Sequence, residues 1–337
     1  MTNEQLRIGL IGTGRIGKVH AVNVAALPDA ALAWVIDPFI TGAEAIADET
    51  GAKATASAEE AFASGDLDAI IIASPTSTHA DLIAKAIRAG IPVLCEKPID
   101  LDITRVDELA PLVENSGVPF AVGFNRRFDR DFSLARERLD AGEIGDLEQL
   151  AIISRDPAPP PVENLRTTGG IFRDQTIHDF DMARYFAPDI VEVFATGSKL
   201  FDEGAAETND FDTAMVLMKT STGAQISITN SRHSSIGYDQ RLELFGGQGM
   251  LEVRNAGTSL VSSSNATSVQ ATPPYQHFFL ERYADAYREE LSEFCRLVRG
   301  ETSRCSSFAD GRAALILADA AEQSAREGRA IRVDLGE

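Results

Sequence analysis

Short apolar runs alternate with helical stretches over the first part of the chain. The apolar runs are residues 7–11, 32–36, 69–73, 93–95 and 120–122, and the segments of helical composition are 18–26, 43–50, 58–63, 79–89 and 104–116. Strands and helices that alternate in this way form a parallel sheet covered on both faces. Gly90 and Gly117 stand where helices would end in a left-handed residue. The pattern predicts a doubly wound α/β domain, a Rossmann fold, over residues 1–122.

After Gly123 the pattern changes to charged helices and to strands with alternating polar and apolar positions. Helices are predicted over residues 129–141, about 171–186, 283–299 and 309–327, and strands over 147–154, 191–198, 213–219, 225–231, 241–246, 249–254 and 331–335. The segment 259–272, rich in Ser, Thr and Asn, is compatible with a strand or a mobile hairpin. Residues 123–337 are therefore expected to form a C-terminal α/β domain with an open, largely antiparallel sheet.

A glycine-rich turn, Gly12-Thr13-Gly14-Arg15-Ile16-Gly17, follows the first apolar run. Glycines there permit a tight turn, let the backbone approach a pyrophosphate, and allow a helix to pack with its N-terminal N–H groups facing the phosphates. Asp37 lies twenty residues after Gly17, where a carboxylate accepts hydrogen bonds from ribose hydroxyls and repels a 2′-phosphate. A glycine motif alone is weak evidence, but here the strand, the helix and the acidic residue occur together. We therefore predict NAD, in preference to NADP, with contacts from Gly12, Gly14, Arg15, Ile16 and Asp37.

Composition narrows the class of protein. With 337 residues, of which 44% are hydrophobic, the chain is long enough for two domains. No apolar segment approaches the roughly 20 residues that span a bilayer, so we expect a soluble, cytoplasmic protein. The formal charge of -20 argues against nucleic acid or an anionic membrane as a partner. Cys95, Cys295 and Cys305 have neither a paired pattern nor CxxC spacing and are expected to be buried thiols.

Two polar segments follow predicted parallel strands, at the carboxyl edge where doubly wound folds bind ligands. Glu96-Lys97-Pro98 follows the fourth of these strands. A lysine there can hydrogen-bond a substrate hydroxyl and stabilise the alkoxide that forms as hydride leaves, although a plain surface lysine is the alternative. Whether the Lys97–Pro98 bond is cis stays open. Ser74, Thr76 and His79 follow the third strand, and we expect them to cap the next helix and to lie beside the cofactor, together with Glu96 and Lys97.

In the second half, Asp174, His178 and Asp181 are spaced i, i+4, i+7, which places them on one face of the predicted helix. A carboxylate one turn before a histidine raises its basicity and holds its ring, so His178 is a candidate catalytic base. A metal site is not expected, because the other histidines, His20, His79, His233 and His277, lack ligand spacing.

With these motifs assembled, the chain resembles the Gfo/Idh/MocA oxidoreductase family, and within it the bacterial inositol dehydrogenases, over essentially its whole length. Besides the glycine-rich turn, the most telling segments are residues 95–100, 123–129, 154–157, 169–185 and 238–241. The resemblance implies a Rossmann domain joined to an α/β domain whose open sheet commonly builds homotetramers.

The resemblance also implies roles for individual residues. In the family, the lysine of the Glu-Lys-Pro motif and an aspartate and histidine four residues apart form the catalytic set, which corresponds to Lys97, Asp174 and His178. Ser154 and Asp156 stand where a known bacterial pattern has His and Asn. The positions that contact the polyol in inositol dehydrogenases correspond to Arg127, Asp156, Asp181 and Tyr238.

The expected function is NAD-dependent oxidation of a ring secondary alcohol, with myo-inositol converted to 2-keto-myo-inositol (scyllo-inosose). His178 would take the hydroxyl proton, Lys97 would hydrogen-bond the same oxygen, and Asp174 would stabilise the imidazolium. The alternatives are another inositol isomer, a pyranose sugar, or a non-catalytic regulator that binds NAD and a sugar.

Overall fold

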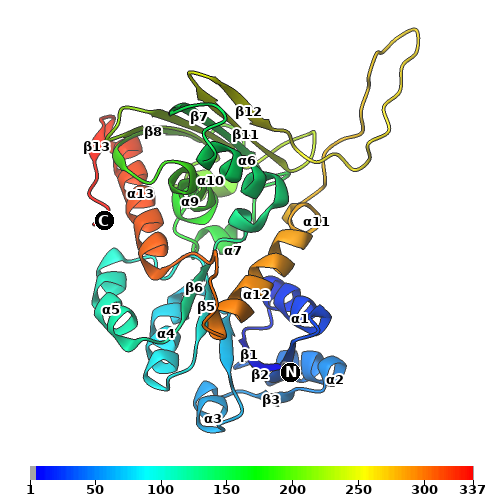
Figure 1. Cartoon of the computed structure of the whole chain (residues 1–337), viewed down its shortest axis with the longest axis vertical. Helices are drawn as coiled ribbons and strands as arrows, with labels where there is room; N and C mark the ends of the chain where they lie inside the picture. Colours follow the sequence, from blue (N-terminus) through cyan, green and yellow to red (C-terminus); the bar gives the residue numbers. More distant parts are fainter. Residues whose placement is uncertain (1–4, 337) are drawn as a thin grey trace. The chain divides into compact units, whose positions relative to one another are not determined.

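The computed structural model describes residues 5–336, which form two compact units (Figure 1). The first comprises the chain up to Phe128 together with Asp285–Ala313, and the second comprises Asp129–Ala284 and the residues from Ala314 onward. The sequence pattern alone assigns residues 285–313 to the second domain. In the structure, helix α12 (Ala284–Val298) buries its apolar face in the core of the first unit, beside β1 and β2.

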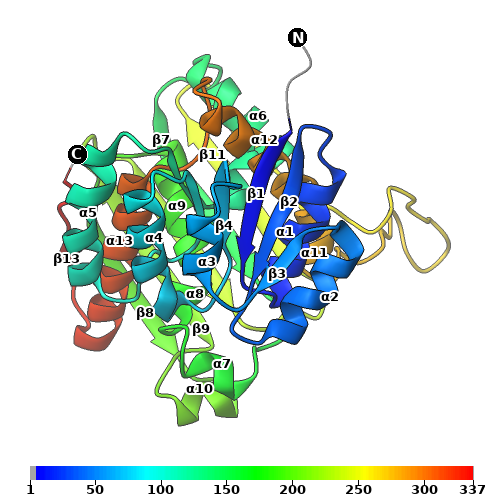
Figure 2. The same ribbon diagram turned by 90° about the horizontal axis from the view of Figure 1, so that it is seen from below.

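The first unit contains a six-stranded parallel sheet in the order β3-β2-β1-β4-β5-β6. Helices α1 and α2 lie on one side of this sheet, and α4 and α5 on the other (Figure 1 and Figure 2). The elements are β1 (Leu6–Ile11), α1 (Arg15–Ala26), β2 (Ala30–Ile36), α2 (Ile40–Thr50), β3 (Lys53–Thr55), α3 (Ala58–Ala63), β4 (Ala69–Ile72), α4 (His79–Arg88), β5 (Val93–Glu96), α5 (Ile103–Ser116) and β6 (Phe120–Gly123). The doubly wound fold predicted from the alternating pattern is confirmed.

The strands of this sheet are apolar because both of its faces are covered. Ile70, Ile71 and Ile72 of β4 are all fully buried. Gly90 and Gly117 have φ angles of 73° and 69°, which confirms the predicted left-handed residues after α4 and α5. The strand β3 is only three residues long and begins with Lys53, so the sequence has no apolar run there that would predict it.

The second unit contains a seven-stranded sheet in the order β12-β11-β7-β10-β9-β8-β13. The β7–β10 pair is parallel and the other pairs are antiparallel, which confirms the prediction of a largely antiparallel sheet. The elements are α6 (Arg130–Asp140), β7 (Leu147–Arg155), α7 (Val162–Leu165), α8 (Ile171–Asp174), α9 (Ile177–Phe186), β8 (Ile190–Ser198), α10 (Glu203–Glu207), β9 (Thr213–Thr220), β10 (Gln225–Ser231), β11 (Asp239–Gly246), β12 (Gly249–Val253), α11 (Phe279–Arg282), α13 (Phe308–Glu327) and β13 (Ile331–Arg332). The division between the two units falls within α13.

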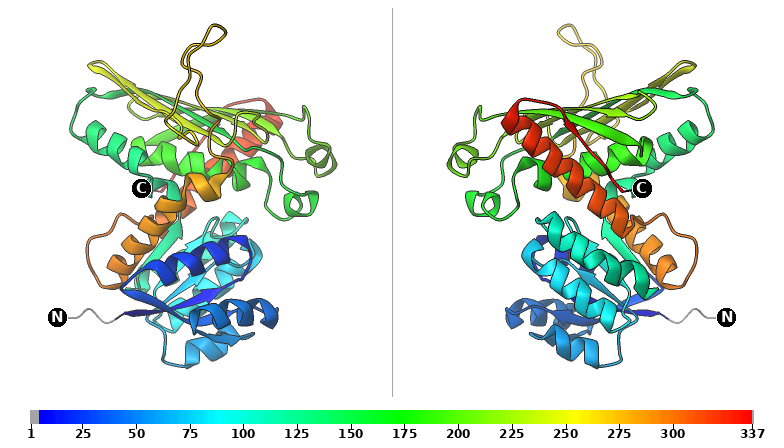
Figure 3. Two further views of the ribbon diagram at one scale, coloured as in Figure 1. Left: turned by 90° about the vertical axis from the view of Figure 1, so that its right-hand side faces the viewer. Right: turned by 90° about the vertical axis from the view of Figure 1, so that its left-hand side faces the viewer.

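One face of this second sheet is covered by helices and the other is open (Figure 3). In β9, Ala214, Val216 and Met218 are buried, whereas Met215 and Leu217 are each 55% exposed. Phe245 and Met250 add exposed apolar side chains on β11 and β12. The open face therefore carries more apolar surface than a solvated sheet face requires.

The single helix predicted over residues 171–186 is wrong, because two helices occupy this segment. Between α8 and α9, the Gln175 side chain donates to the carbonyl oxygens of Ser154 and Ser231, at 3.3 and 3.1 Å. The Thr176 hydroxyl donates to Asn230 Oδ1 at 2.9 Å. These buried bonds to the ends of β7 and β10 hold the chain in a turn there, and helical periodicity gives no sign of them.

The segment of residues 257–275 forms a projecting hairpin with isolated bridges at Gly257–Tyr275 and Ser263–Ala271 (Figure 1). Of the two predicted possibilities, the hairpin is the one observed. No helix among residues 5–336 combines the length and the apolarity needed to cross a bilayer.

A buried arginine holds the second unit together near α8. The guanidinium of Arg232, which is fully buried, lies 3.1 Å from Asp210 Oδ2 and 3.4 Å from Asp174 Oδ2. Asp210, 4% exposed, also accepts the backbone N–H of Ile171 at 2.9 Å. The cation thus links the loop before β9 to both ends of α8.

We expect Arg232→Met to lower the free energy of unfolding by about 3–5 kcal/mol, because Asp210 would stay buried without its cationic partner. Urea unfolding followed by circular dichroism measures this. Arg254→Met is the matched control: Arg254 pairs with Glu252 but is 84% exposed, so its loss should leave the urea midpoint unchanged. Equal midpoints for both variants would contradict the assignment.

Candidate active site

The residues predicted to contact the cofactor gather at one edge of the first unit's sheet. The glycine-rich turn follows β1, Asp37 follows β2, Ser74 lies after β4, and Glu96 ends β5. These four strands are neighbours in the order β2-β1-β4-β5, and all run parallel. The chain reverses its winding direction at β1, which is where doubly wound folds bind ligands.

The glycine-rich turn has the close contacts that a dinucleotide cradle requires. Gly12 has φ of 99°, and a Cβ there would lie 2.5 Å from the Ala73 carbonyl oxygen. A Cβ on Gly17 would lie 2.0 Å from the Gly12 carbonyl oxygen. A Cβ on Gly14 would meet nothing within 4 Å, so the space above this residue is open. Alanine would thus be excluded at Gly12 and Gly17 by the fold itself, but at Gly14 only by a ligand.

The N-terminus of α1 suits an anionic group. Its N-cap is Gly14, which supplies no capping side chain, and its first turn contains no acidic residue. The first N–H groups of the helix and the positive end of its dipole lie at this turn. Arg15 is exposed and Ile16 is partly exposed at the same place. These residues fit the pyrophosphate of NAD.

Asp37 fixes the turn as well as facing the predicted ribose site. Its Oδ2 accepts the backbone N–H of Thr13 at 2.9 Å and the Thr13 hydroxyl at 2.7 Å, and its Oδ1 accepts the N–H of Phe39 at 2.8 Å. A carboxylate has further lone pairs that can accept ribose hydroxyls. The sequence analysis assigned no role to Thr13. Its position inside the glycine motif could have identified it as a partner of Asp37.

The loop after β4 does not cap α4 in the way the sequence predicted. The N-cap is Thr78, and its side chain caps nothing: its hydroxyl donates to the Pro75 carbonyl and pairs with Ser74 Oγ at 2.7 Å. Thr76 begins a short 3-10 turn. The side chain of His79 is only 1% exposed and is enclosed by the protein, whereas Ser74 and Thr76 are partly exposed to solvent.

Lys97 lies in a tight turn after β5, and its bond to Pro98 is cis. Lys97 is partly exposed. On one side, Glu96 Oε1 lies 2.7 Å from Nε2 of His20, and on the other, the Pro98 carbonyl oxygen lies 2.8 Å from Nδ1 of His79. Sequence reasoning gave His20 no role.

In the second unit, four of the predicted residues gather near the ends of β7, β10 and β11. Asp174 ends α8 and His178 lies in the first turn of α9; both are partly exposed. Asp156 follows β7 and donates its N–H to the Ser231 carbonyl, and Tyr238 precedes β11. Because Arg155 pairs with Asp239 in an antiparallel register, Asp156 and Tyr238 continue neighbouring strands.

The two remaining polyol candidates are buried, as Tyr238 is. Asp181 lies on α9 and is 1% exposed. Arg127 belongs to the first unit, where its guanidinium lies 3.1 Å from Asp310 Oδ1, and it is 9% exposed.

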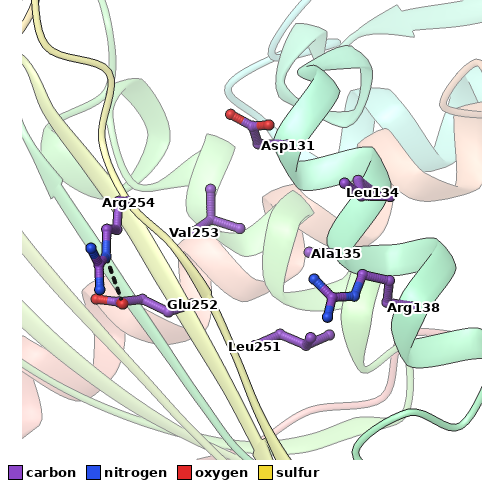
Figure 4. A pocket seen from close by; sticks show the side chains of 8 residues that line it. All are labelled: Asp131, Leu134, Ala135, Arg138, Leu251, Glu252, Val253 and Arg254. Atoms are coloured by element: carbon purple, nitrogen blue, oxygen red, sulfur yellow. Dashed lines mark hydrogen bonds and ion pairs between the residues drawn. The ribbon is translucent and has the colours of Figure 1, made fainter. Parts of the chain in front are cut away.

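A pocket of about 280 Å³ lies between α6 and β12 (Figure 4). It is lined by Asp131, Leu134, Ala135, Arg138, Leu251, Glu252, Val253 and Arg254. Figure 4 shows that two of these lining residues, Arg254 and Glu252, form an ion pair. None of the predicted site residues lines this pocket.

Metal and thiolate sites place requirements on the ligating side chains and on the cysteines. Within residues 5–336, no group of three or more His, Cys, Asp or Glu side chains could hold a metal ion. All three cysteines are free thiols. Burial raises the pKa of Cys295 to about 11 and that of Cys305 to about 12, so neither supplies a thiolate near neutral pH.

The glycine geometry gives a prediction. Gly14→Ala should leave the thermal midpoint of unfolding near that of wild type but weaken NAD binding by about tenfold or more, because the new methyl group enters space that only a ligand fills. Gly17→Ala, its control, should lower the thermal midpoint, since overpacking typically costs about 1–3 kcal/mol. Calorimetric titration with NAD and thermal unfolding measure the two effects. Wild-type NAD affinity in Gly14→Ala would refute the cradle.

Known proteins resemble this chain over nearly its full length. An inositol 2-dehydrogenase of Rhizobium meliloti is 45% identical over 331 residues, which cover 97% of this chain and 99% of the relative. The crystal structure of a myo-inositol dehydrogenase from Corynebacterium glutamicum matches with a TM-score of 0.94 and 51% identity, covering 98% and 99% of the two chains. A scyllo-inositol dehydrogenase from Lactobacillus casei with bound NAD(H) and scyllo-inositol matches with a TM-score of 0.90 and 27% identity, covering 98% and 99%.

Both parts of the chain also match one family. Residues 6–124 match the oxidoreductase family with an NAD-binding Rossmann fold, and residues 132–252 match the GFO/IDH/MocA C-terminal domain. The chain belongs to the Gfo/Idh/MocA family of NAD-binding oxidoreductases.

Proposed function

We propose that this protein oxidises myo-inositol to 2-keto-myo-inositol (scyllo-inosose) with NAD⁺. The observation that carries the proposal is the coincidence of two features. The chain has near full-length similarity to an inositol 2-dehydrogenase, and it contains Lys97, Asp174 and His178, the set that such chemistry needs.

In the proposed reaction, His178 is the general base that removes the proton of the reacting hydroxyl. Lys97 donates a hydrogen bond to the same oxygen and stabilises its developing negative charge. Asp174 stabilises the imidazolium that forms on His178. The contact between Asp174 and the buried guanidinium of Arg232 orients this carboxylate. When bound, NAD⁺ accepts the hydride of the carbinol carbon.

Binding of the cofactor and of the polyol is assigned to different residues. The dinucleotide is bound by the glycine-rich turn and the residue after β2, namely Gly12, Gly14, Arg15, Ile16 and Asp37. The loop with Ser74, Thr76 and His79 and the Glu96-Lys97 turn also contact it. The polyol is contacted by Arg127, Asp156, Asp181 and Tyr238, because a ring with many hydroxyls needs both hydrogen-bond acceptors and hydrogen-bond donors.

We further propose a homotetramer built through the open face of the second unit's sheet. In each chain the first unit binds NAD, and the second unit supplies most of the contacts to the substrate. Met215, Leu217, Phe245 and Met250, all exposed in the single chain, support this surface as the interface. A cytoplasmic location and a role in inositol catabolism complete the proposal. Three free thiols suit a reducing compartment.

A polyol panel tests the substrate. We expect NADH absorbance to rise fastest with myo-inositol when scyllo-inositol, D-chiro-inositol and glucose are assayed beside it. Faster reduction with another polyol would replace myo-inositol as substrate. Calorimetric binding of NAD and a polyol without NADH formation would favour a regulator over an enzyme.

His178→Ala should lower kcat by about 10²- to 10⁴-fold while NAD still binds, because a general base typically contributes that factor. His277→Ala is the matched control, since His277 is exposed and is not among the residues assigned to catalysis or binding. Stopped assays for kcat and titration for NAD affinity separate the two quantities. Full activity in His178→Ala would show that another group is the base.

A further inference from the structure

Two buried histidines contact the turn that carries Lys97, one on each side of it. His20 comes from α1 and is 0% exposed, and His79 comes from α4 and is 1% exposed. His20 contacts the residue before Lys97, and His79 contacts the residue after it. All of these residues lie in the first unit.

On the first side, Nε2 of His20 lies 2.7 Å from Glu96 Oε1. The ring of His20 meets the edge of the Tyr287 ring, with 6.0 Å between the ring centroids. The Glu96 carboxylate is also confined by β6, because a Cβ on Gly123 would lie only 3.1 Å from Glu96 Oε2. Since α1 begins at the glycine-rich turn, this contact joins the predicted pyrophosphate site to the start of the lysine turn.

On the second side, His79 makes contacts through both ring nitrogens. Nδ1 lies 2.8 Å from the Pro98 carbonyl oxygen, and Nε2 lies 2.8 Å from the Ser74 carbonyl oxygen. Carbonyl oxygens only accept, so a contact is a hydrogen bond where the facing ring nitrogen carries its N–H. His79 thus joins the loop after β4, which also contributes to the predicted cofactor site, to the end of the lysine turn.

We propose that His20 and His79 are positioning residues for Lys97, and that through them the lysine is held in register with both predicted NAD-binding segments. The inference rests on the catalytic role proposed for Lys97. A lysine side chain is long and flexible, so its ammonium group is placed only if the backbone on each side of it is fixed. A displacement of about 1 Å at a catalytic group can cost about 10²-fold in rate.

His79→Asn and His79→Gln separate the two contacts of His79. The amide nitrogen of asparagine matches the position of Nδ1 and keeps a donor for Pro98, whereas that of glutamine matches Nε2 and keeps a donor for Ser74. We expect kcat to fall by about 10- to 100-fold in His79→Gln and to stay closer to wild type in His79→Asn. Equal kcat values per folded molecule in the two variants, with only the thermal midpoint lowered, would show a merely structural role and overturn the proposal.

His20→Leu removes the donor to Glu96, and His20→Gln restores one at the position of Nε2. We expect a loss of kcat in His20→Leu that His20→Gln largely recovers, with His277→Gln as an unaffected control. In a Lys97→Ala background, His20→Leu should add little further loss, because a residue that acts through Lys97 has nothing left to position. Additive losses in this cycle would contradict the proposal.

Hydrogen–deuterium exchange provides a readout that does not depend on activity. The backbone amides of Glu96 and Lys97 should exchange faster in His79→Gln and His20→Leu than in His79→Asn and wild type. If no polyol in the panel supports NAD⁺ reduction by the wild-type protein, but the variants show the expected exchange pattern, the proposed function fails and the positioning of the Lys97 turn by the histidines stands. If the wild-type protein is active but the histidine substitutions change neither the exchange rates nor kcat, the positioning proposal fails and the proposed function stands.

Discussion

The close approach of Gly12 to the backbone of Ala73 and Ser74 is the contact on which the cofactor site depends. A Cβ at Gly12 would lie 2.5 Å from one carbonyl oxygen and 2.7 Å from the next backbone nitrogen, so only glycine lets the ends of β1 and β4 come this close. Gly17 approaches the carbonyl oxygen of Gly12 just as tightly, so the first turn of α1 packs directly against the glycine-rich turn. The order of the strands brings Asp37 and the Lys97 turn to the same edge, and the catalytic and binding roles proposed for the first unit follow from that convergence.

Local polar groups must overcome an unfavourable overall charge. The chain carries a formal charge of -20, and a dinucleotide is itself anionic. At physiological ionic strength, charges more than about 8 Å away are largely screened, so the nearest dipoles decide the binding energy. The uncapped N-terminus of α1, without acidic residues in its first turn, supplies them. The Asp37 carboxylate is hydrogen-bonded to Thr13 and Phe39, and is therefore held in place at the proposed ribose end of the site.

Buried polar contacts give the second unit its site in the same way. Gln175 and Thr176 form bonds to the ends of β7 and β10 that separate α8 from α9, and Arg232 contacts Asp174 directly. Unsatisfied buried polar groups are costly, so such a network accepts few alternative arrangements. The two proposed catalytic side chains of this unit thus lie on segments that the sheet holds in place.

The sequence by itself determined the strands other than β3 and most of the helices, because apolar periodicity and glycine at helix ends are local signals. It also determined NAD binding, since the glycine motif and Asp37 act within one βαβ unit, and it singled out Lys97, Asp174 and His178. Only the tertiary structure decided that residues 285–313 pack with the first unit, that residues 171–186 form two helices, and that Thr78 caps nothing. It also revealed the contacts of His20 and His79, which join residues 76 and 19 positions apart. Those features depend on hydrogen bonds and packing between segments distant in the chain, and neither composition nor periodicity encodes such contacts.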